Sequence, residues 1–284
     1  MPPHSRPLQM LPGNTRRHRP LLDMRHPEPE IIRSPQNQLI KRVRSLGLRK
    51  NRDAERAFVV EGSRGIESAL DFGHAPQVVM LADDARSDME DLALLADVPL
   101  RIVERAVFDS VMDTATPQGI AAIFSRPDAI LPDVIHPFLL VLDGVGDPGN
   151  LGTLIRSAAA ASCDAIIVGP ACADPWSAKA ARSSMGSIFG LPVLSTTREL
   201  EAIVVERCER RWLADGDGAV DYTEPVWSGS VAIIVGSEGH GASQWGWGLA
   251  TGSIGIRLAN GVESLNAAVA GSILMFEARR QRME

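Results

Sequence analysis

Residues 138–168 read FLLVLDGVGDPGNLGTLIRSAAAASCDAIIV, and this stretch decides the fold class. Its apolar ends, 138–142 and 165–168, predict buried strands. The segment between them, 151–161, predicts a helix with one apolar face, formed by Leu151, Leu154, Ile155 and Ala158. Two strands joined through a helix run parallel in one sheet, so the stretch predicts an α/β fold.

The same alternation of strands and helices continues to the C-terminus. Further strands are expected at 192–194, 211–214, 231–235 and 253–258, and further helices at 177–185, 199–206 and 265–282. We therefore expect a domain at 138–284 with a mainly parallel sheet and helices on both faces. Ligands of such folds bind at the carboxyl ends of the strands, where functional residues should lie.

The residues before this domain divide into a tail, a smaller domain and a linker. Residues 1–30 contain seven prolines and three neighbouring arginines, which predicts a disordered Pro/Arg-rich tail. A smaller α/β domain is expected at 31–126, from a basic amphipathic helix at 34–52, a helix at 62–72, and strands at 57–60, 77–81, 100–103 and 119–124. Residues 127–137 contain three prolines and little periodicity, which predicts a linker.

Composition places the chain among globular proteins. Its 284 residues are 45% hydrophobic and 23% charged, with three cysteines and a net charge of −6. The cysteines form no CxxC pair, which argues against a disulfide framework or a zinc site and for a cytoplasmic protein without a metal. No apolar stretch reaches about 18 residues, so we expect no membrane span, and no export signal is evident.

Charge is distributed unevenly along the chain. Residues 1–60 carry 13 Lys and Arg against 5 Asp and Glu, whereas residues 61–284 carry 16 against 30. A basic N-terminal segment followed by an acidic remainder favours binding of a polyanion. Arginines that only keep a loose terminus in solution would give the same pattern. The cations of the first helical segment are Lys41, Arg42, Arg44, Arg49, Lys50 and Arg52. Two further cations, Lys179 and Arg182, could equally touch phosphates or face solvent.

The loop after the strand at 138–142 carries the first polar constellation. Asn150 would cap the next helix, and Arg156 lies about 100° away from that helix's apolar stripe. The GxGxxG spacing of a dinucleotide site is satisfied by Gly144, Gly146 and Gly149. Pro148 interrupts the loop, and no acidic residue ends the next strand to hold a ribose. A nicotinamide-dependent oxidoreductase is therefore only an alternative.

Two further constellations follow later strands. In GSEGHG, residues 236–241, the glycines allow a tight turn around Glu238, but the loop lacks the Lys-Ser/Thr pair of a nucleotide-binding P-loop. Before the C-terminal helix, Ser264 would serve as the N-cap. Asn266 would lie in the first turn, where free backbone N–H groups can meet a polar ligand.

In this order the three constellations resemble the signature motifs of the SpoU/TrmH family of RNA ribose 2′-O-methyltransferases. Residues 34–124, with FVVEG at 58–62 and TPQGI at 116–120, are similar to the substrate-binding domain that many members carry in front. The segment at 174–192 also resembles the family. The resemblance implies a deep trefoil knot in the C-terminal domain, a homodimer, and S-adenosylmethionine as the methyl donor.

The resemblance also implies roles for individual residues. The adenosyl group would be held at Gly236, Ile256, Leu258 and Leu265. A ribose hydroxyl is a poor nucleophile that needs in-line placement and a proton acceptor. Arg156 would serve as that acceptor, or, since an arginine is normally protonated, would hold the target phosphate and orient the hydroxyl. The residues expected to complete the catalytic site are Asn150, Glu238, Ser264 and Asn266.

Ribosomal RNA, with the large subunit favoured, is the expected substrate. A separate front domain and a basic helix suit recognition of a folded RNA by its backbone and shape. Transfer RNA, or a catalytically silent RNA-binding or ribosome-assembly protein of the same fold, remains an open alternative. Cofactor binding separates the classes, since the enzyme binds S-adenosylmethionine, the silent protein binds no cofactor and the oxidoreductase binds NAD(H).

Overall fold

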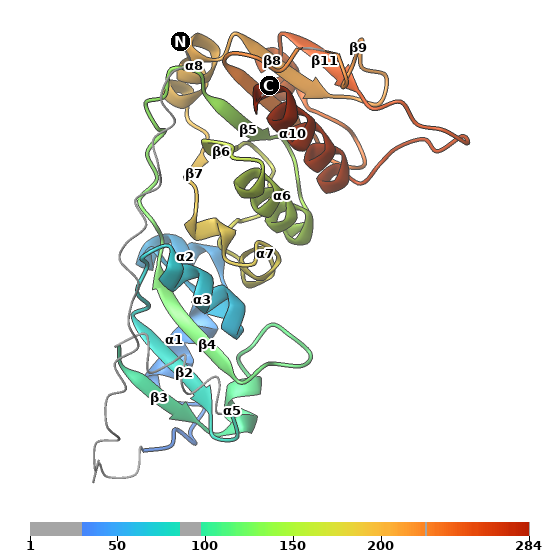
Figure 1. Ribbon diagram of the computed structural model, residues 1–284. Coiled ribbons are helices and arrows are strands. Elements are labelled where there is room, and N and C mark those ends of the chain that lie inside the picture. The colour runs from blue at the N-terminus through green and yellow to red at the C-terminus, as the bar shows by residue number, and fades with distance from the viewer. Residues whose placement is uncertain (1–29, 86–97, 225, 284) are drawn as a thin grey trace.

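The computed structural model describes residues 30–85, 98–224 and 226–283, so the expected tail lies outside the described residues apart from its last position. The described chain forms two sheets, one in each half (Figure 1). Residues 126–137 join the two sheets without forming a helix or a strand. The predicted order, a small α/β part followed by a larger parallel sheet, is confirmed.

The first sheet has four strands in the order β1-β4-β2-β3. The central strand β4 (Ile120–Ser125) runs antiparallel to both β1 (Ala57–Glu61) and β2 (Val78–Ala82). Strand β3 (Leu100–Val103) adds to β2 in parallel. The described helices of this half are α1 (Gln38–Leu46), α2 (Arg49–Glu55), α3 (Ser63–Asp71) and α5 (Arg105–Asp109).

The single basic helix expected at 34–52 is two helices. Asn37 caps α1 through its side chain, which accepts from the Leu39 N–H at 2.8 Å. The helix ends at Gly47, and Leu48 is extended before α2 begins. Ile40, Val43 and Leu46 point into the core of the first half, as their spacing predicts.

The second sheet has seven strands in the order β7-β6-β5-β10-β8-β11-β9, and every neighbouring pair is parallel. These strands are β5 (Phe138–Leu142), β6 (Ala165–Val168), β7 (Val193–Ser195), β8 (Arg210–Ala214), β9 (Val220–Asp221), β10 (Val231–Val235) and β11 (Gly252–Gly255). Strand β10 therefore lies at the centre although it forms late in the chain.

Helices cover both faces of this sheet, as predicted. Leu140 and Leu142 of β5 face the core that contains Leu154 of α6 and Leu274 of α10, whereas Val141 faces the core beneath α8, as alternation along a strand requires. The helices are α6 (Pro148–Ala160), α7 (Ala178–Ser183), α8 (Arg198–Arg207), α9 (Gln244–Leu249) and α10 (Ala267–Met283), with one 3₁₀ turn, η1 (Ser187–Phe189).

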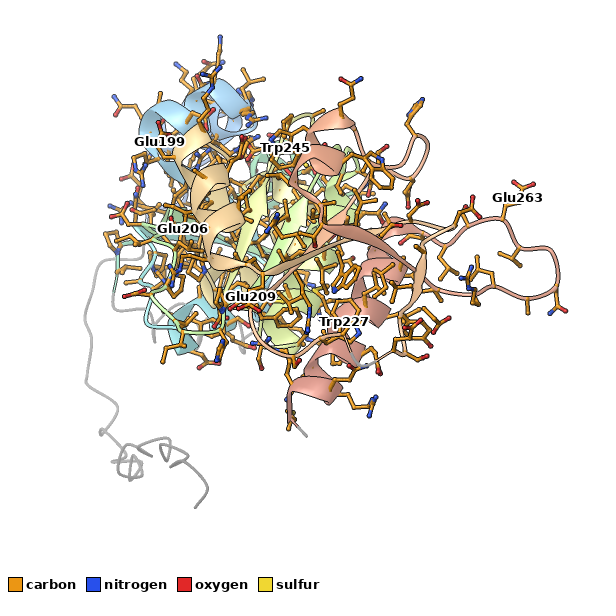
Figure 2. The ribbon with its side chains drawn as sticks, turned by 90° about the horizontal axis from the view of Figure 1, so that it is seen from above. Glu199, Glu206, Glu209, Trp227, Trp245 and Glu263 are labelled. Carbon is orange, nitrogen blue, oxygen red and sulfur yellow. The ribbon has the colours of Figure 1, made fainter. Side chains whose placement is uncertain are left out.

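The sequence pattern misplaced several boundaries in the second half. The expected strand at 253–258 ends at Gly255, and the residues after it lead through a loop that projects from the body of the protein (Figures 1 and 2). The helix expected at 265–282 begins at Ala267. Helix α9 was not predicted, because its sequence QWGWGL contains two glycines and no helical apolar period.

The two halves share one hydrophobic core at their junction. Phe58 of β1 contacts Trp176 and Phe189 of the second half, with ring centroids 5.0 and 5.5 Å apart. Phe124 of β4 lies 4.9 Å from the same Phe189. The four rings belong to a single buried cluster that extends into the large sheet, so the front half is packed against the second half as one body.

Candidate active site

A cavity of about 270 Å³ opens at the carboxyl ends of β8, β10 and β11. All four residues expected to hold an adenosyl group line it, namely Gly236, Ile256, Leu258 and Leu265. Two of the expected catalytic residues, Glu238 and Ser264, line it as well. The cavity lies where a parallel sheet is expected to bind its ligand.

The lining of this cavity fits S-adenosylmethionine. Its walls are apolar at Val235, Ile254 and Leu274, which suits the flat adenine ring. Carboxylates at Glu238 and Glu263 lie beside those walls and suit the positive sulfonium. A donor with an apolar ring and a cationic centre therefore finds both kinds of surface here.

A tight turn shapes one wall of the cavity. Ser237 and Gly241 exchange two backbone hydrogen bonds, at 2.9 and 3.0 Å, and Gly241 has a φ of +67°, which favours glycine. A Cβ on Gly236 would come 2.5 Å from the Ala242 nitrogen. Gly236 and Gly241 are therefore needed for the turn itself, whereas a Cβ on Gly239 would meet open space.

A polar network joins the three motif loops. Asn266 donates through Nδ2 to Oε1 of Glu238 and, at 3.0 Å, to Oδ1 of Asn150. The Ala267 N–H also donates to Oε1 of Glu238, at 3.3 Å. Residues up to 116 positions apart in the sequence thus meet at one point.

The caps of the two flanking helices differ from the predicted ones. Asp147, rather than Asn150, caps α6, since its Oδ1 accepts the Asn150 N–H at 2.9 Å. Asn266, rather than Ser264, caps α10, since its Oδ1 accepts from the N–H groups of Ala268 and Val269 at 3.0 and 3.1 Å. This cap also fixes which end of the Asn266 amide faces Glu238, because the oxygen is already engaged.

A second cavity of about 280 Å³ adjoins the first. Ser237, Glu238 and Ala267 line both. The rest of its lining comes from residues 144–147 of the loop after β5, from Asn150 in the first turn of α6, and from Gly239 and His240. Two neighbouring sites that share Glu238 offer room for a donor and an acceptor side by side.

Arg156 does not line either cavity. It is exposed on the outer face of α6, and no hydrogen bond or ion pair joins it to another described residue. Within one chain, the structure therefore brings together Asn150, Glu238 and Asn266 but leaves the arginine expected to act with them outside.

Sequence reasoning missed a buried carboxylate at the start of the first loop. Asp143 is 2% exposed and accepts from Ser243, through the backbone N–H at 2.6 Å and the hydroxyl at 3.0 Å. It ties the loop after β5 to the end of the glycine-rich turn. The sequence does indicate this residue, because Asp143 directly follows the apolar run 138–142, and a carboxylate buried there needs a hydrogen-bond partner.

The structure argues against a dinucleotide at the GxGxxG loop. The Asp147 carboxylate occupies the N-terminus of α6, where a pyrophosphate would bind, and repels a phosphate there. Lys179 donates to this carboxylate at 2.7 Å, and the hydrogen bond holds the pKa of Asp147 below its usual value. Lys179 is thus paired with protein rather than presented alone to solvent.

Besides Lys179, the residues expected to bind RNA fall into three groups. Lys41, Arg44, Arg49 and Lys50 are exposed on α1 and α2. Arg42 and Arg182 are partly exposed and paired, the first with Glu55 at 2.8 Å and the second with Glu61 at 3.4 Å. Arg52 is buried, which corrects the expectation that it faces RNA.

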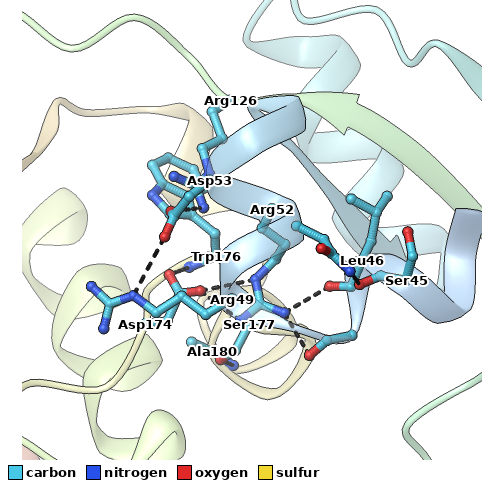
Figure 3. A network of polar contacts seen from close by, with 12 residues as sticks. Ser45, Leu46, Arg49, Arg52, Asp53, Arg126, Asp174, Trp176, Ser177 and Ala180 are labelled. Atoms are coloured by element: carbon cyan, nitrogen blue, oxygen red, sulfur yellow. Dashed lines mark hydrogen bonds and ion pairs between the residues drawn. The ribbon is translucent and has the colours of Figure 1, made fainter.

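Arg52 instead fastens the two halves together (Figure 3). Its Nε and Nη2 donate to Oδ2 of Asp174 at 2.8 and 2.6 Å, and its Nη1 donates to the carbonyls of Leu46 and Gly47 at 2.7 and 2.8 Å. The side chains of the pair are only 6% and 8% exposed. Four of its five N–H donors are thus engaged, and its burial keeps the guanidinium away from a phosphate at the surface.

Acidic side chains gather on α8, which covers the face of the large sheet opposite to α6 and α10. Figure 2 shows Glu199 and Glu206 on α8 and Glu209 after it. Trp245 of α9 lies beside α8 and donates through its indole N–H to Glu201 at 2.8 Å. Like-charged side chains of this kind disfavour a polyanion at the exposed face of α8.

The described residues contain no group of His, Cys, Asp and Glu side chains that could hold a metal ion. Among the same residues, no helix has the length and apolar character needed to cross a membrane. The three cysteines are free, and burial raises the pKa of Cys208 to about 11. Burial thus makes this thiol a weak nucleophile.

Two family models match this chain. The model of the SpoU rRNA Methylase family matches residues 137–276, and the model of the MRM3-like substrate binding domain matches residues 37–122. The 23S rRNA (guanosine(2553)-2′-O)-methyltransferase RlmP of Bacillus subtilis is 33% identical over 252 residues, which cover 87% of this chain and 98% of that protein.

Solved structures give the same result. An AdoMet-bound rRNA methyltransferase from Sinorhizobium meliloti superposes with a TM-score of 0.77 at 30% identity, covering 88% of this chain and 97% of that one. The SpoU methyltransferase AviRb from Streptomyces viridochromogenes, in complex with AdoMet, gives a TM-score of 0.76 at 25% identity, covering 87% and 99%.

Proposed function

This chain belongs to the SpoU rRNA methylase family and is an S-adenosylmethionine-dependent RNA ribose 2′-O-methyltransferase, and we propose that its substrate is large-subunit ribosomal RNA. The observation that carries the proposal is the network in which Asn266 joins Glu238 to Asn150 between two adjoining cavities. The match of residues 37–122 to a substrate-binding domain supports RNA as the acceptor.

The first cavity holds the methyl donor. When bound, S-adenosylmethionine supplies a methyl group on a positively charged sulfur. Ile256, Leu258 and Leu265 enclose the adenosyl part, and Gly236 lets the backbone approach it closely. The apolar walls exclude water, which would otherwise compete with the ribose hydroxyl for the site.

The second cavity holds the target ribose. One oxygen of Glu238 is engaged by Asn266 and by the Ala267 N–H, so its other oxygen is left to accept a hydrogen bond from a ribose hydroxyl. Asn266 and the Ala267 N–H hold Glu238 in place, and Asn150 in turn accepts a hydrogen bond from Asn266. Ser264, on the loop before α10, lines the donor cavity and would order that loop beside the reacting groups.

The complete site includes Arg156 of a second copy. On α10, Val269 and Phe276 are 48% and 47% exposed and lie on one side of the helix, nearly opposite Ala267 and Leu274, which face the cavity. Helix α6, which carries Arg156, packs beside α10 through the Ser157 and Ser272 hydroxyls, 2.7 Å apart. A homodimer through this surface would cover the apolar residues and bring Arg156 to the partner's cavity, where it holds the target phosphate or takes up the hydroxyl proton.

The remaining expectations complete this proposal. We place the RNA substrate-binding domain at residues 31–126, the linker at 127–137 and the methyltransferase domain at 138–284, with a deep trefoil knot in the last. The matched ranges of the two family models agree with that division. A cytoplasmic location fits three unpaired thiols.

The test is methyl transfer from tritiated S-adenosylmethionine to ribosomal and transfer RNA from a strain lacking the gene. Nuclease mapping should place the label in an alkali-resistant dinucleotide of the large-subunit RNA. The variant Arg156→Ala should lose transfer while binding the donor normally, because its side chain lies outside the donor cavity. Label found only in transfer RNA, or none in any RNA despite donor binding, would refute the proposed substrate.

A mixing experiment tests the dimer. Arg156→Ala and Asn266→Ala are each expected to be inactive, but after exchange of subunits a mixed dimer has one cavity with an intact Asn266 network and an intact Arg156 from the partner. Partial recovery of transfer is therefore expected. No recovery from mixtures that demonstrably contain mixed dimers would show that Arg156 acts within its own chain or not at all.

A further inference from the structure

A third cavity, of about 290 Å³, lies at the junction of the two halves. Arg49 and Asp53 of α2 and Arg126, after β4, line it from the front half. Its other wall is the segment that follows β6, residues 168–176, together with Ser195 and Thr196 after β7. The cavity thus opens at the same carboxyl edge of the large sheet as the donor site, two strands away from β10.

Arg126 gives this cavity an unsatisfied donor. Its Nη2 donates to Asp53 at 2.7 Å, and its guanidinium lies 5.6 Å from the centre of the Trp176 ring (Figure 3). Its Nε is buried and has no hydrogen-bond partner among the described residues. A buried N–H without a partner is costly, so the Arg126 side chain would be stabilised by turning this edge toward an acceptor in the cavity.

Arg49 adds a second cation that is only weakly held. Its Nε lies 3.8 Å from Asp53, which Arg126 already engages, and its side chain is largely exposed. Arg52 and Asp174 are paired with each other, which leaves Arg49 and Arg126 sharing one carboxylate, Asp53. Glu201 lies behind Thr196 and accepts from its hydroxyl. Two guanidinium groups around one carboxylate, at a site closed on one side by protein, favour an anion.

The wall of this cavity is bonded to the active site. The Gly144 N–H donates to the Pro170 carbonyl at 3.0 Å, and the Ala173 N–H donates to the Val145 carbonyl at 2.9 Å. The loop after β6 therefore lies directly against the loop after β5, which carries Asn150. Strand spacing of about 4.8 Å places the cavity roughly 10 Å along the sheet edge from β10, so a strand of RNA can occupy both.

We propose that the junction cavity is a phosphate subsite for the substrate RNA, in which Arg49 and Arg126 bind a backbone phosphate and set the register of the strand that enters the active site. The inference rests on the proposed function, since it assumes an RNA acceptor. The Arg126 side chain turns its Nε toward the ligand oxygen, which accepts from it and draws Arg49 away from Asp53. The site adds position rather than sequence recognition, because phosphates are alike along the chain.

The test uses the full chain and a pair of variants that differ only in charge. Ser195 is exposed at the rim of the cavity, so both Ser195→Glu and Ser195→Gln should fold. The added carboxylate should weaken binding of ribosomal RNA about fivefold, whereas the amide should leave it unchanged. Arg49→Gln should lower the slope of log affinity against log salt by about 1. Arg56→Gln, an exposed arginine outside the cavity, is the control.

Each outcome decides one question. Equal RNA affinity for Ser195→Glu and Ser195→Gln, or an unchanged salt slope for Arg49→Gln, would overturn the subsite while wild-type methyl transfer to RNA still supports the enzyme. A further outcome would identify inorganic phosphate as the true ligand. In that case phosphate at millimolar concentration would weaken RNA binding while none of the variants changed RNA affinity, and the cavity would be assigned to free phosphate instead. No transfer to any RNA by the wild type would instead refute the proposed function.

Discussion

Replacing Arg52 by Met should cost about 3–5 kcal/mol of stability, the range for breaking a buried ion pair. The estimate follows from the burial of both partners, 6% and 8% exposed, and from the four hydrogen bonds that Arg52 donates. In the variant, Asp174 stays buried with only the Trp176 N–H donating to it, and two backbone carbonyls lose their donor. The double variant Arg52→Met with Asp174→Leu should recover most of the loss, since an apolar pair leaves no uncompensated charge.

Urea unfolding followed by far-UV circular dichroism measures these free energies for wild type, both single variants and the double variant. A coupling energy of about 3 kcal/mol or more is expected from the double-mutant cycle. Limited proteolysis at 126–137 should become faster in the single variants, because the front half is less firmly packed. A loss below about 1 kcal/mol in Arg52→Met would refute the reasoning, since a pair that costs so little to break does not fasten the two halves.

Three further predictions concern the active site and its helices. Asn266→Ala should lower the free energy of unfolding by only about 1 kcal/mol, as for a lost N-cap, but should reduce the rate of methyl transfer by far more than that loss of folded protein explains. A reduction in rate no larger than the loss of folded protein would contradict the network. Gly271→Val should destabilise by about 1–3 kcal/mol, because its Cβ would lie 2.6 Å from Leu154 between α6 and α10, and an unchanged melting temperature would refute that packing. The pKa of Asp147 is lowered in the folded state. The stabilisation of the fold by its carboxylate is therefore complete above the unfolded pKa of about 3.9 and is lost as the pH falls through the lower folded pKa. The difference in melting temperature between wild type and Asp147→Asn should accordingly shrink below about pH 4.

The alternation of strands and helices was predictable because it depends on local periodicity. Residues 138–168 contain the whole strand-helix-strand unit, and its parallel direction follows from the helix between the strands. The position of β10 between β5 and β8 was not predictable, because periodicity shows which segments are strands and not which neighbours they choose.

The site was predictable in its members and not in its details. Glycines, Glu238 and Asn266 stood out as polar residues at the ends of apolar runs, but an N-cap is decided by backbone geometry among several suitable side chains, so Asp147 and Asn266 displaced the expected caps. The prediction that Arg52 binds RNA was wrong for a different reason. Its partner Asp174 is 122 positions away, and a buried arginine resembles an exposed one in the sequence.

The order of the large sheet has a consequence for the chain as it leaves the ribosome. Strand β5 pairs with β6 on one side and with β10 on the other, and the second pairing can form only when residues 231–235 have emerged. At about 5–20 residues per second, the intervening segment of roughly 90 residues takes about 5–18 seconds to make, during which that edge of β5 has no partner strand. The donor cavity also needs Leu265 and Ala267, so the nascent protein gains its cofactor site only after these residues, which follow β10 in the chain, have emerged.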